Sequence, residues 1–397
     1  MLENSKNKQR RALERSAESP MKMNCYYNPV KTAEGKGSLH LLPDLVREAV
    51  PHGARILILT WSEQAVKSPV FASLKETCGA ESVAVRLFKD SNPTIRQLYR
   101  LYAETRSIRP NLIIAVGGGS VMDAGKTLCL MTDMELGSEN DLRGIIEKKR
   151  YGKPAARWIG IPTTAGTGSE VTCWATVWDP ETDVKRSVES KENFAFAAIV
   201  DPDLSAGMPR ALAVASALDA VAHGVESYWA RASNPVSAAL ALAAISRIMG
   251  HMEELASGEK EVGEDMALGS MMAGLAFSNT KTTACHSISY PLTMEYHIPH
   301  GAAVGMLLGP VLMLNFESVA EPEPLLKALG IRRPEELSGK IRGIMEAAGL
   351  PFTLSGWKVP EQAILKLSSH GMTKGRADNN PQELSEEIIE HILREIY

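Results

Sequence analysis

Four side chains in the second half of the sequence have the types and spacing of a metal site. The stretch 284–301 contains three of the nine histidines of the chain, all among apolar and small residues. Upstream, Asp219 and His223 lie four positions apart in an alanine-rich run, so on a helix they share one face. Buried ionisable groups are costly unless they are paired or bind a metal. We therefore predict that a divalent transition metal is held by Asp219, His223, His286 and His300.

Each of these histidines alone would be interpreted as a core or helix-capping residue. Taken together with Asp219, they place donor atoms on at least three separate segments, as a metal site requires. The remaining histidine of the stretch, His297, is expected at the rim of a pocket. Fe²⁺ and Zn²⁺ accept the same ligands, so the sequence leaves the choice between these two metals open.

Two loops in the first half of the chain have the composition of phosphate-binding turns. The first, 117–127, begins with three glycines that let backbone N–H groups approach an anion, and a predicted helix follows it. The second, 162–170, offers hydroxyl groups that suit a ribose or a second phosphate. Two tight turns with positive φ are the alternative interpretation. Because both loops follow predicted strands, the pattern favours a dinucleotide.

A metal beside a dinucleotide suggests hydride transfer to a carbonyl group. The metal polarises the carbonyl as a Lewis acid, an effect of several kcal/mol, and the reduced nicotinamide delivers the hydride. A phosphate-transferring NTPase is the alternative from another class, since Gly125-Lys126-Thr127 resembles the end of a Walker A motif. The first glycine of that motif is replaced by Ser120, and an NTPase would leave the metal cluster unexplained.

Composition and charge indicate an ordinary globular protein. The 397 residues favour two or more domains, and a formal charge of −4 gives no electrostatic footprint for nucleic acid. No apolar run is expected to approach the roughly 20 residues that span a bilayer. The five cysteines are scattered without a CxxC pair, which predicts reduced thiols and a cytoplasmic protein. Residues 1–20 are polar, lack the apolar core of a secretory signal and are predicted to form a disordered extension.

Short apolar runs alternate with helical patterns in the first half of the chain. This order predicts an open α/β sheet with right-handed crossovers, in which ligands bind at the carboxyl ends of the strands. Helices are expected at 63–78 and 94–107, and an antiparallel hairpin at 173–190, where a proline and two aspartates mark the turn. Strands are predicted at 55–62, 82–88, 112–116, 158–162 and 196–200.

After Leu204 the pattern becomes helical and strand-like alternation disappears. Pro209 can open the first of these helices. We therefore predict a Rossmann-like α/β domain over 21–204 and an all-α domain over 205–397, with a ligand cleft between them. Helices are predicted at 210–231, 235–257, 264–278, around His286, at 301–315 and at 384–397.

Several short sequence motifs follow one another in a fixed order along the chain. They are Asn92-Pro93-Thr94, Gly117-Gly118-Gly119-Ser120 with Asp123 and Lys126, Pro162-Thr163-Thr164-Ala165-Gly166-Thr167, Asp219 with His223, His286, and Pro299-His300-Gly301. From about Asn28 to the C-terminus, the chain thereby resembles the iron-containing (group III) alcohol dehydrogenases. The resemblance implies the two-domain dehydroquinate synthase-like fold, a homodimer, and Fe²⁺ or Zn²⁺ bound by the aspartate and the three histidines.

The resemblance also implies roles for residues around the two loops. The loops bind NAD(H) or NADP(H), and Tyr290 and Lys126 are the residues implied for catalysis. The cofactor-binding residues implied are Trp61, Asn92, Gly117, Gly118, Gly119, Ser120, Asp123, Thr163, Thr164 and Thr167.

Two positions depart from the family pattern. Members commonly have a further histidine, implicated in proton handling, where this chain has Tyr290. A phenol has a pKa near 10 and is a poor base at neutral pH, although it can donate a hydrogen bond. Members that prefer NAD often carry an aspartate at the end of the first strand, where this chain has Thr60-Trp61-Ser62. No carboxylate there repels a 2′-phosphate, so both NAD and NADP are expected to bind.

A narrower resemblance concerns the substrate. The stretch 286–293, with 174–179 and a basic pair soon after it, resembles the phosphonoacetaldehyde reductase branch, to which sulfoacetaldehyde reductases are similar. The resemblance implies reduction of phosphonoacetaldehyde to 2-hydroxyethylphosphonate, with cations or hydroxyls that bind the anion. Sulfoacetaldehyde reductase, a general alcohol dehydrogenase and a metal-dependent cyclase-lyase on a related scaffold remain alternatives. The anion-binding candidates are Arg186, Lys281 and Ser287, with Lys185, Ser289 and Arg376 as further possibilities.

Overall fold

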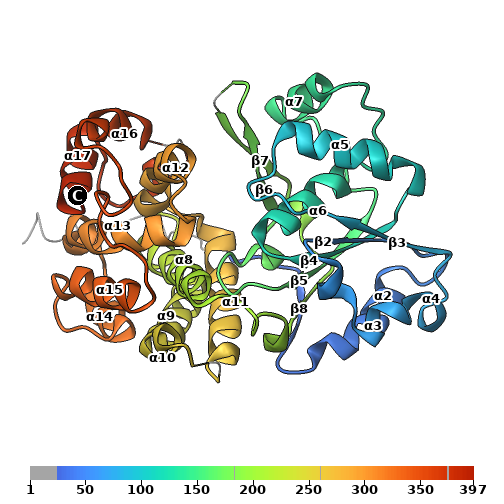
Figure 1. Cartoon of the computed structure of the whole chain (residues 1–397), viewed down its shortest axis with the longest axis horizontal. Helices are drawn as coiled ribbons and strands as arrows, with labels where there is room; N and C mark the ends of the chain where they lie inside the picture. The colour runs from blue at the N-terminus through green and yellow to red at the C-terminus, as the bar shows by residue number, and fades with distance from the viewer. Residues whose placement is uncertain (1–24, 183, 260, 373–374) are drawn as a thin grey trace, which may run out of the picture.

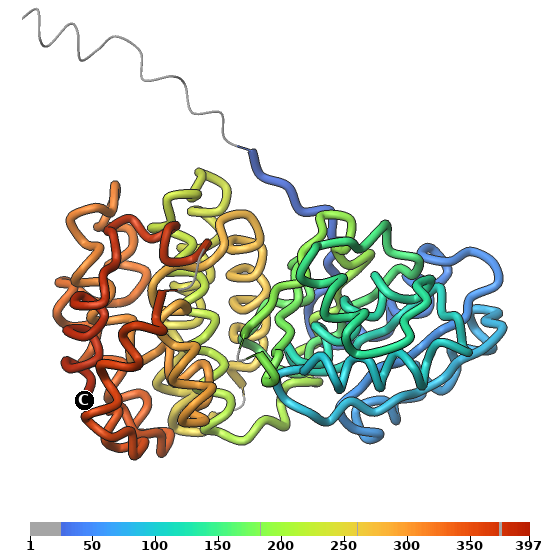
Figure 2. Tube along the Cα trace, turned by 90° about the horizontal axis from the view of Figure 1, so that it is seen from above, coloured from blue at the N-terminus to red at the C-terminus, as the bar shows by residue number. Residues whose placement is uncertain are grey.

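The chain folds into an α/β half and a helical half that lie side by side. The computed structural model describes residues 25–182, 184–259, 261–372 and 375–397, so the extension predicted over 1–20 lies outside the described residues. Figure 1 shows the α/β half in blue to green and the helical half in yellow-green to red. Figure 2 shows the same separation from above.

The α/β half is built on a parallel sheet of six strands in the order β1-β8-β5-β4-β2-β3. β2, β4 and β5 are buried along nearly their whole length, as their apolar sequences require. Gly117 of β4 pairs with Pro162 of β5, so the two predicted phosphate-binding loops start next to each other. The strands are β1 (Lys31–Glu34), β2 (Arg55–Thr60), β3 (Ser82–Leu87), β4 (Leu112–Gly117), β5 (Arg157–Pro162) and β8 (Ala197–Val200).

Helices cover both faces of this sheet, because successive strand residues point to opposite sides. Ile56 and Ile58 of β2 belong to a core that includes α2, α3 and α4, whereas Leu57 and Leu59 belong to a core that includes α5, α6 and α7. The helices are α2 (Leu42–Ala49), α3 (Pro69–Ala72), α4 (Leu74–Thr77), α5 (Ile95–Thr105), α6 (Gly119–Met131) and α7 (Glu139–Glu147).

The predicted hairpin is present as the antiparallel strands β6 (Trp174–Asp179) and β7 (Val184–Glu189). It stands between the two halves in Figure 1. The backbone N–H of Trp178 donates to Pro93 O over 2.8 Å, and Arg143 of α7 donates to both oxygens of the buried Asp179 carboxylate, at 2.8 and 3.1 Å. These contacts fasten the hairpin to the α/β half.

The helical half is organised around α8, which packs against α9, α11 and α13. Small residues allow these helices to approach closely. A Cβ atom on Gly301 would lie 1.8 Å from the carbonyl oxygen of Ala215, so α13 contacts the backbone of α8 directly. The helices are α8 (Arg210–Trp229), α9 (Pro235–Met249), α10 (Met252–Ser257), α11 (Gly263–Thr280), α12 (Ala284–Tyr296), α13 (His300–Asn315), α14 (Pro322–Leu329), α15 (Glu336–Ala347), α16 (Ile364–His370) and α17 (Glu386–Glu395).

Some predicted elements are interrupted or were missed. The helix predicted at 63–78 is a 3₁₀ turn followed by α3 and α4, because Pro69 has no backbone N–H and starts a new helix. The helix predicted at 235–257 breaks into α9 and α10 near Gly250. β1, α2 and α7 were not predicted. β1 is an edge strand of four residues, Lys-Thr-Ala-Glu, without an apolar pattern.

The expectation that no apolar run approaches the length of a bilayer span is wrong for α13. The segment His300–Ser318 is long and apolar enough by length and composition, with a mean hydropathy of 1.3. However, 72% of that window is buried inside the protein, as is typical of a core helix. The domain boundary near residue 204 stays a prediction, although the last strand of the sheet ends at Val200 and α8 begins at Arg210.

Candidate metal and nucleotide site

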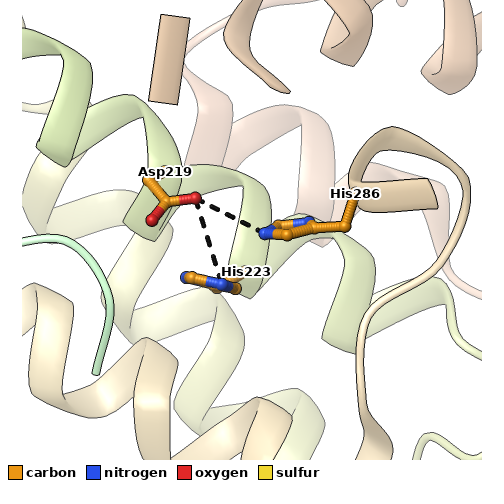
Figure 3. Close-up of side chains that lie close together, drawn as sticks. All are labelled: Asp219, His223 and His286. Carbon is orange, nitrogen blue, oxygen red and sulfur yellow. Dashed lines mark ion pairs between the residues drawn. The ribbon is translucent and has the colours of Figure 1, made fainter. Parts of the chain in front are cut away.

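The four predicted metal ligands converge from three helices of the helical half. α8 carries Asp219 and His223, α12 carries His286, and α13 begins with His300. All three imidazole Nε2 atoms face one oxygen, Oδ1 of Asp219, at 4.0 Å from His223, 3.4 Å from His286 and 3.7 Å from His300. Figure 3 shows Asp219, His223 and His286 pointing toward one another.

This arrangement fits a transition metal. Ligands bonded at about 2.1 Å in a tetrahedron lie about 3.4 Å apart, close to the separations observed. Among the described residues, Asp219 Oδ1 and His286 Nε2 are buried and have no hydrogen-bond partner. Buried polar atoms without partners are costly, and a shared cation supplies the missing interaction. The cluster of Asp219, His223 and His286 also places one donor atom of each residue within 4.8 Å of the others.

A buried carboxylate that the sequence analysis missed orients one of these ligands. Glu226 is fully buried on α8, and its Oε2 accepts a hydrogen bond from His286 Nδ1. Its Oε1 accepts from the Thr283 hydroxyl at 2.9 Å and from the Cys285 backbone at 2.6 Å. Carboxylates commonly hold metal-binding imidazoles in this way. The available signal was spacing, since Glu226 lies seven residues after Asp219 in the same apolar run.

A backbone carbonyl orients a second ligand. Nδ1 of His223 lies 3.3 Å from Gly166 O, in the loop after β5. A proton on Nδ1 donates to this carbonyl and leaves the lone pair of Nε2 toward Asp219. The ring of His223 also stacks on Phe277 of α11, with centroids 4.1 Å apart. The loop after β5 therefore supports the metal cluster as well as facing the nucleotide loop.

The charges on Asp219, His223 and His300 suit metal binding at neutral pH. Burial lowers the pKa of His223 to about 4 and that of His300 to about 3, so both imidazoles are neutral and their lone pairs are available. Burial opposes ionisation of Asp219, but the three histidines outweigh it and hold the pKa of this carboxyl below its usual range. Burial likewise opposes a charge on His286, but Glu226 and Asp219 outweigh it and raise its pKa.

One cavity of about 640 Å³ joins the metal cluster to the glycine-rich loop. Its walls come from both halves of the chain, which confirms that the predicted ligand cleft lies between them. Residues predicted to bind cofactor or metal that line this cavity are Asn92, Gly119, Ser120, Asp123, Thr167, Asp219, His223, His286 and His300.

Several predicted cofactor residues do not line the cavity. A Cβ atom on Gly118 would lie 3.3 Å from the Thr164 side chain, and a Cβ atom on Gly119 would lie 2.9 Å from the Thr167 side chain. The glycines thus let the two loops pack against each other. Gly117 and Thr163 lie at the strand ends behind this contact, and their backbones share a hydrogen bond of 3.0 Å. Trp61 follows Thr60, which pairs with Val116 just before Gly117, but its side chain is 51% exposed and does not line the cavity.

Lys126 and Asp123 support the loops from within α6. Lys126 is fully buried, and its Nζ donates to Ser169, Thr172 and the Trp174 carbonyl over 2.7 to 2.9 Å. It does not line the cavity, so the structure does not place it where the predicted catalytic role requires. The carboxylate of Asp123 accepts from the Ser169 hydroxyl at 3.1 Å and the Thr176 backbone at 2.9 Å.

Tyr290 lies in the cavity, between the metal cluster and two cations. Its ring is stacked on His300, with centroids 5.8 Å apart. Nζ of Lys185 lies 3.2 Å from the ring centroid and Cζ of Arg376 lies 5.2 Å from it. Burial raises the pKa of Tyr290 to about 12, so the phenol keeps its proton at neutral pH.

The structure separates the predicted anion-binding residues into two groups. Lys185, Lys281 and Arg376 line the cavity. Arg186 is instead held on the outer part of the hairpin by Asp179 and Glu147, at 3.0 and 2.8 Å, and these carboxylates occupy its guanidinium. Ser287 is buried and donates to Gly371 O over 2.5 Å, while Ser289 donates to His286 O over 3.1 Å. The predictions for Arg186, Ser287 and Ser289 therefore lack the required placement.

Comparison with known proteins identifies the family. The family models for iron-containing alcohol dehydrogenase and for the C-terminal part of the Fe-containing alcohol dehydrogenase family match residues 29–202 and 213–397. A choline dehydrogenase from Bacillus subtilis is 31% identical over 345 residues, covering 84% of each chain. The chain belongs to the iron-containing alcohol dehydrogenase family and is an oxidoreductase. The family uses iron and NAD(P), which confirms the predicted cofactors.

Two further relatives bear on fold and substrate. Phosphonoacetaldehyde reductase from Streptomyces viridochromogenes is 29% identical over 323 residues, covering 77% of this chain and 81% of the relative. The crystal structure of sulfoacetaldehyde reductase from Bifidobacterium kashiwanohense in complex with NAD⁺ matches with a TM-score of 0.83 and 24% identity. It covers 94% of this chain and 98% of the other. This likeness confirms the predicted fold.

Proposed function

We propose that the protein reduces a short aldehyde bearing a strong anion, with phosphonoacetaldehyde as the first candidate and 2-hydroxyethylphosphonate as its product. The observation that carries this proposal is the single cavity joining the Asp219 cluster to the end of the Gly119 loop. The reaction consumes one NAD(P)H and one proton for each aldehyde reduced. The protein is further proposed to act as a cytoplasmic homodimer, a state that light scattering of the purified protein tests.

Each end of the cavity has its own binding role. Asp219, His223, His286 and His300 hold Fe²⁺ or Zn²⁺, and the N-terminus of α6 at Gly119 and Ser120 receives the cofactor phosphates. Asn92, whose backbone N–H donates to the Ser120 hydroxyl over 3.0 Å, and Thr167 line the same end. When bound, the metal supplies a Lewis acid for the aldehyde oxygen and the cofactor supplies the hydride.

The remaining residues orient the substrate and limit the protons available. Phe277 and Leu212 add apolar surface to the cavity, which excludes water from the reacting carbon. Tyr290 stays protonated and can donate a hydrogen bond, but its raised pKa makes it a weak acid that does not readily transfer its proton to an alkoxide. The proton that completes the alcohol is therefore expected to come from water or a cofactor hydroxyl.

Cofactor choice is proposed to be broad. β2 ends at Thr60 and is followed by the exposed Trp61. Thr60, Trp61 and Ser62 place no carboxylate at this strand end that would repel a 2′-phosphate, so NADPH as well as NADH is expected to bind.

The substrate proposal is supported by charge as well as by resemblance. The relative from Streptomyces viridochromogenes is a phosphonoacetaldehyde reductase, and the cations Lys185 and Arg376 lie beside the metal cluster. Sulfoacetaldehyde shares the two-carbon aldehyde and the strong anion, so it is the second candidate substrate. Choline, named for the Bacillus subtilis relative, is cationic, and the same two side chains are expected to repel it.

An absorbance assay at the NAD(P)H band tests the proposal. The metal-loaded protein is supplied with phosphonoacetaldehyde, sulfoacetaldehyde, propionaldehyde and, in the reverse direction, choline, each with both cofactors. We expect the highest kcat/KM for phosphonoacetaldehyde. Equal rates for charged and uncharged aldehydes would indicate a general alcohol dehydrogenase. Substrate conversion without net cofactor oxidation would indicate a cyclase-lyase, and release of phosphate from ATP would indicate an NTPase.

A further inference from the structure

Two cations from opposite halves of the chain meet on the ring of Tyr290. Lys185 belongs to β7 of the hairpin, whereas Arg376 lies in the segment between α16 and α17. Their cationic groups lie 3.2 Å and 5.2 Å from the centroid of the same ring, and both side chains line the cavity. Bringing two like charges together in a partly desolvated site costs free energy.

Neither cation has a close partner that cancels its charge. Asp123 and Asp219 attract Lys185 from a greater distance, but burial and Arg376 still hold the pKa of Lys185 well below its usual range. Among the ion pairs of the described residues, no carboxylate lies within 4.0 Å of Lys185 or Arg376. The nearby cations differ: Lys281 pairs with Glu189 at 3.1 Å, and Arg186 pairs with Asp179 and Glu147. Arg376 Nε donates a hydrogen bond of 3.2 Å to the Thr282 hydroxyl. This hydroxyl is uncharged, so it orients the guanidinium without neutralising its charge.

We propose that Lys185 and Arg376 form a subsite for a tetrahedral oxyanion, and that this oxyanion is the phosphonate or sulfonate of the substrate. The inference rests on the proposed function and deepens it by naming the residues that select the substrate. A guanidinium and an ammonium together present several donors to such a group. A bound dianion also removes the repulsion between the two cations.

The ring of Tyr290 sets the length of substrate that fits. It lies parallel to the His300 ring, with 5° between the planes and 5.8 Å between the centroids, and Lys185 covers its surface. The aldehyde would bind at the metal cluster next to His300 and the oxyanion next to Lys185, and both of these residues contact the ring of Tyr290. A short spacer between the two groups satisfies that geometry, whereas a long spacer displaces one of them.

The two halves of the chain each contribute one cation, so the oxyanion contacts both at once. A bound substrate therefore contacts both the hairpin and the helical half, next to the metal cluster. An anion could also come from the cofactor, whose phosphates are expected at the far end of the cavity, near Gly119. Binding measurements with the cofactor alone separate these two sources.

The experiment compares three charge-removing variants of the full-length, metal-loaded protein. Lys185→Gln and Arg376→Gln each remove one subsite cation. Lys366→Gln is the matched control, because Lys366 does not line the cavity and its ammonium pairs with Glu295 at 2.7 Å. Calorimetry measures the binding of ethylphosphonate, which cannot be reduced, and fluorescence measures the binding of NADPH. Circular dichroism checks that each variant is folded.

We expect Lys185→Gln and Arg376→Gln to weaken ethylphosphonate binding by about 10- to 100-fold, the usual effect of losing a charged hydrogen-bond partner. The kcat/KM for phosphonoacetaldehyde should fall by a similar factor, while that for propionaldehyde changes less than about threefold. Lys366→Gln should retain both. Weakened NADPH binding with unchanged ethylphosphonate binding would assign the cations to the cofactor and overturn the proposal.

Failure of the subsite and failure of the proposed function have different signatures. If no aldehyde is reduced but ethylphosphonate binding still depends on Lys185 and Arg376, the proposed reaction is wrong and the anion subsite stands. If aldehydes are reduced but all three variants bind ethylphosphonate as the unmodified protein does, the reaction stands and the subsite is refuted.

Discussion

The two ends of the cavity differ in the groups they present: side chains at the metal end, and glycines and backbone groups at the nucleotide end. At the metal end, the side chains of Asp219, His223 and His286 are buried, and Gly166 and Glu226 fix the two imidazoles. At the nucleotide end, the loops after β4 and β5 offer glycines and backbone groups, and their side chains mostly pack against each other. The metal end therefore depends on the identity of single residues, whereas the nucleotide end depends on backbone shape.

Removing one ligand should abolish the function of the metal end. In His286→Ala we expect loss of the bound metal and a fall in reductase activity of at least about 1,000-fold, because several kcal/mol of transition-state stabilisation are lost. Metal analysis and the NAD(P)H absorbance assay measure the two losses together.

The matched control for this change is His297→Asn. His297 is exposed at the end of the same helix and has φ 55°, a conformation that asparagine tolerates. This variant should keep its metal and its activity. A metal-free His286→Ala protein that turned over at the full rate would remove the Lewis-acid role.

The position of the metal end also depends on close helix packing. In Gly301→Ala the added Cβ would meet the Ala215 carbonyl oxygen at 1.8 Å, so α13 must move away from α8. We expect the free energy of unfolding to fall by about 2 to 4 kcal/mol, measured by urea denaturation. Gly339→Ala is the control, because Gly339 is exposed in α15 with open space around it. That change should stabilise the protein by up to about 1 kcal/mol.

Glu226 should act on the metal only through His286. In Glu226→Gln the side chain keeps its shape but loses the charge that orients the imidazole, so we expect metal affinity to fall by about 10- to 100-fold. Competition with a zinc chelator measures this affinity. Glu264→Gln, an exposed carboxylate near the start of α11, should leave it unchanged. Equal affinities for both variants would show that Glu226 is only a buried structural residue.

In the α/β half, the contact that Asp179 of the hairpin makes with Arg143 should make protein stability depend on pH. Hydrogen bonding from Arg143 lowers the pKa of Asp179 from 3.8 to about 2. Its contribution to stability is therefore complete above pH 3.8 and is lost as the pH falls through the folded value. Between pH 5 and pH 3 the wild-type protein should lose more stability than Asp179→Asn, by about 1 kcal/mol, as measured by urea denaturation. An equal loss of stability in both proteins would contradict a lowered pKa at Asp179.

The same contrast explains what could be predicted from the sequence. Asp219 and His223 were recognisable because a helix converts four-residue spacing into one face, and β2, β4 and β5 because parallel strands buried on both faces are continuously apolar. Glu226 was missed because its only signal, a spacing of seven residues from Asp219, does not show whether a glutamate is buried or contacts His286. β1 was missed because an edge strand needs no apolar pattern.

The sequence could not show which of two adjacent cations, Lys185 or Arg186, faces the cavity. Lys185 and Arg186 are neighbours on β7, yet their side chains point to opposite faces of the strand, and only the one that faces the cavity lacks a carboxylate partner. Which face is which depends on the packing of the hairpin against α7, through Arg143 and Asp179. That tertiary contact joins residues 36 positions apart, and no local pattern in the sequence predicts it.

Anomalous diffraction from crystals of the metal-loaded protein tests the central claim most directly. Data collected above and below the absorption edge of iron or zinc locate the ion without reference to activity. The account predicts one strong peak within bonding distance of Asp219 Oδ1 and the Nε2 atoms of His223, His286 and His300. An active, metal-containing crystal with no peak at these atoms, or with its peak elsewhere, would contradict it.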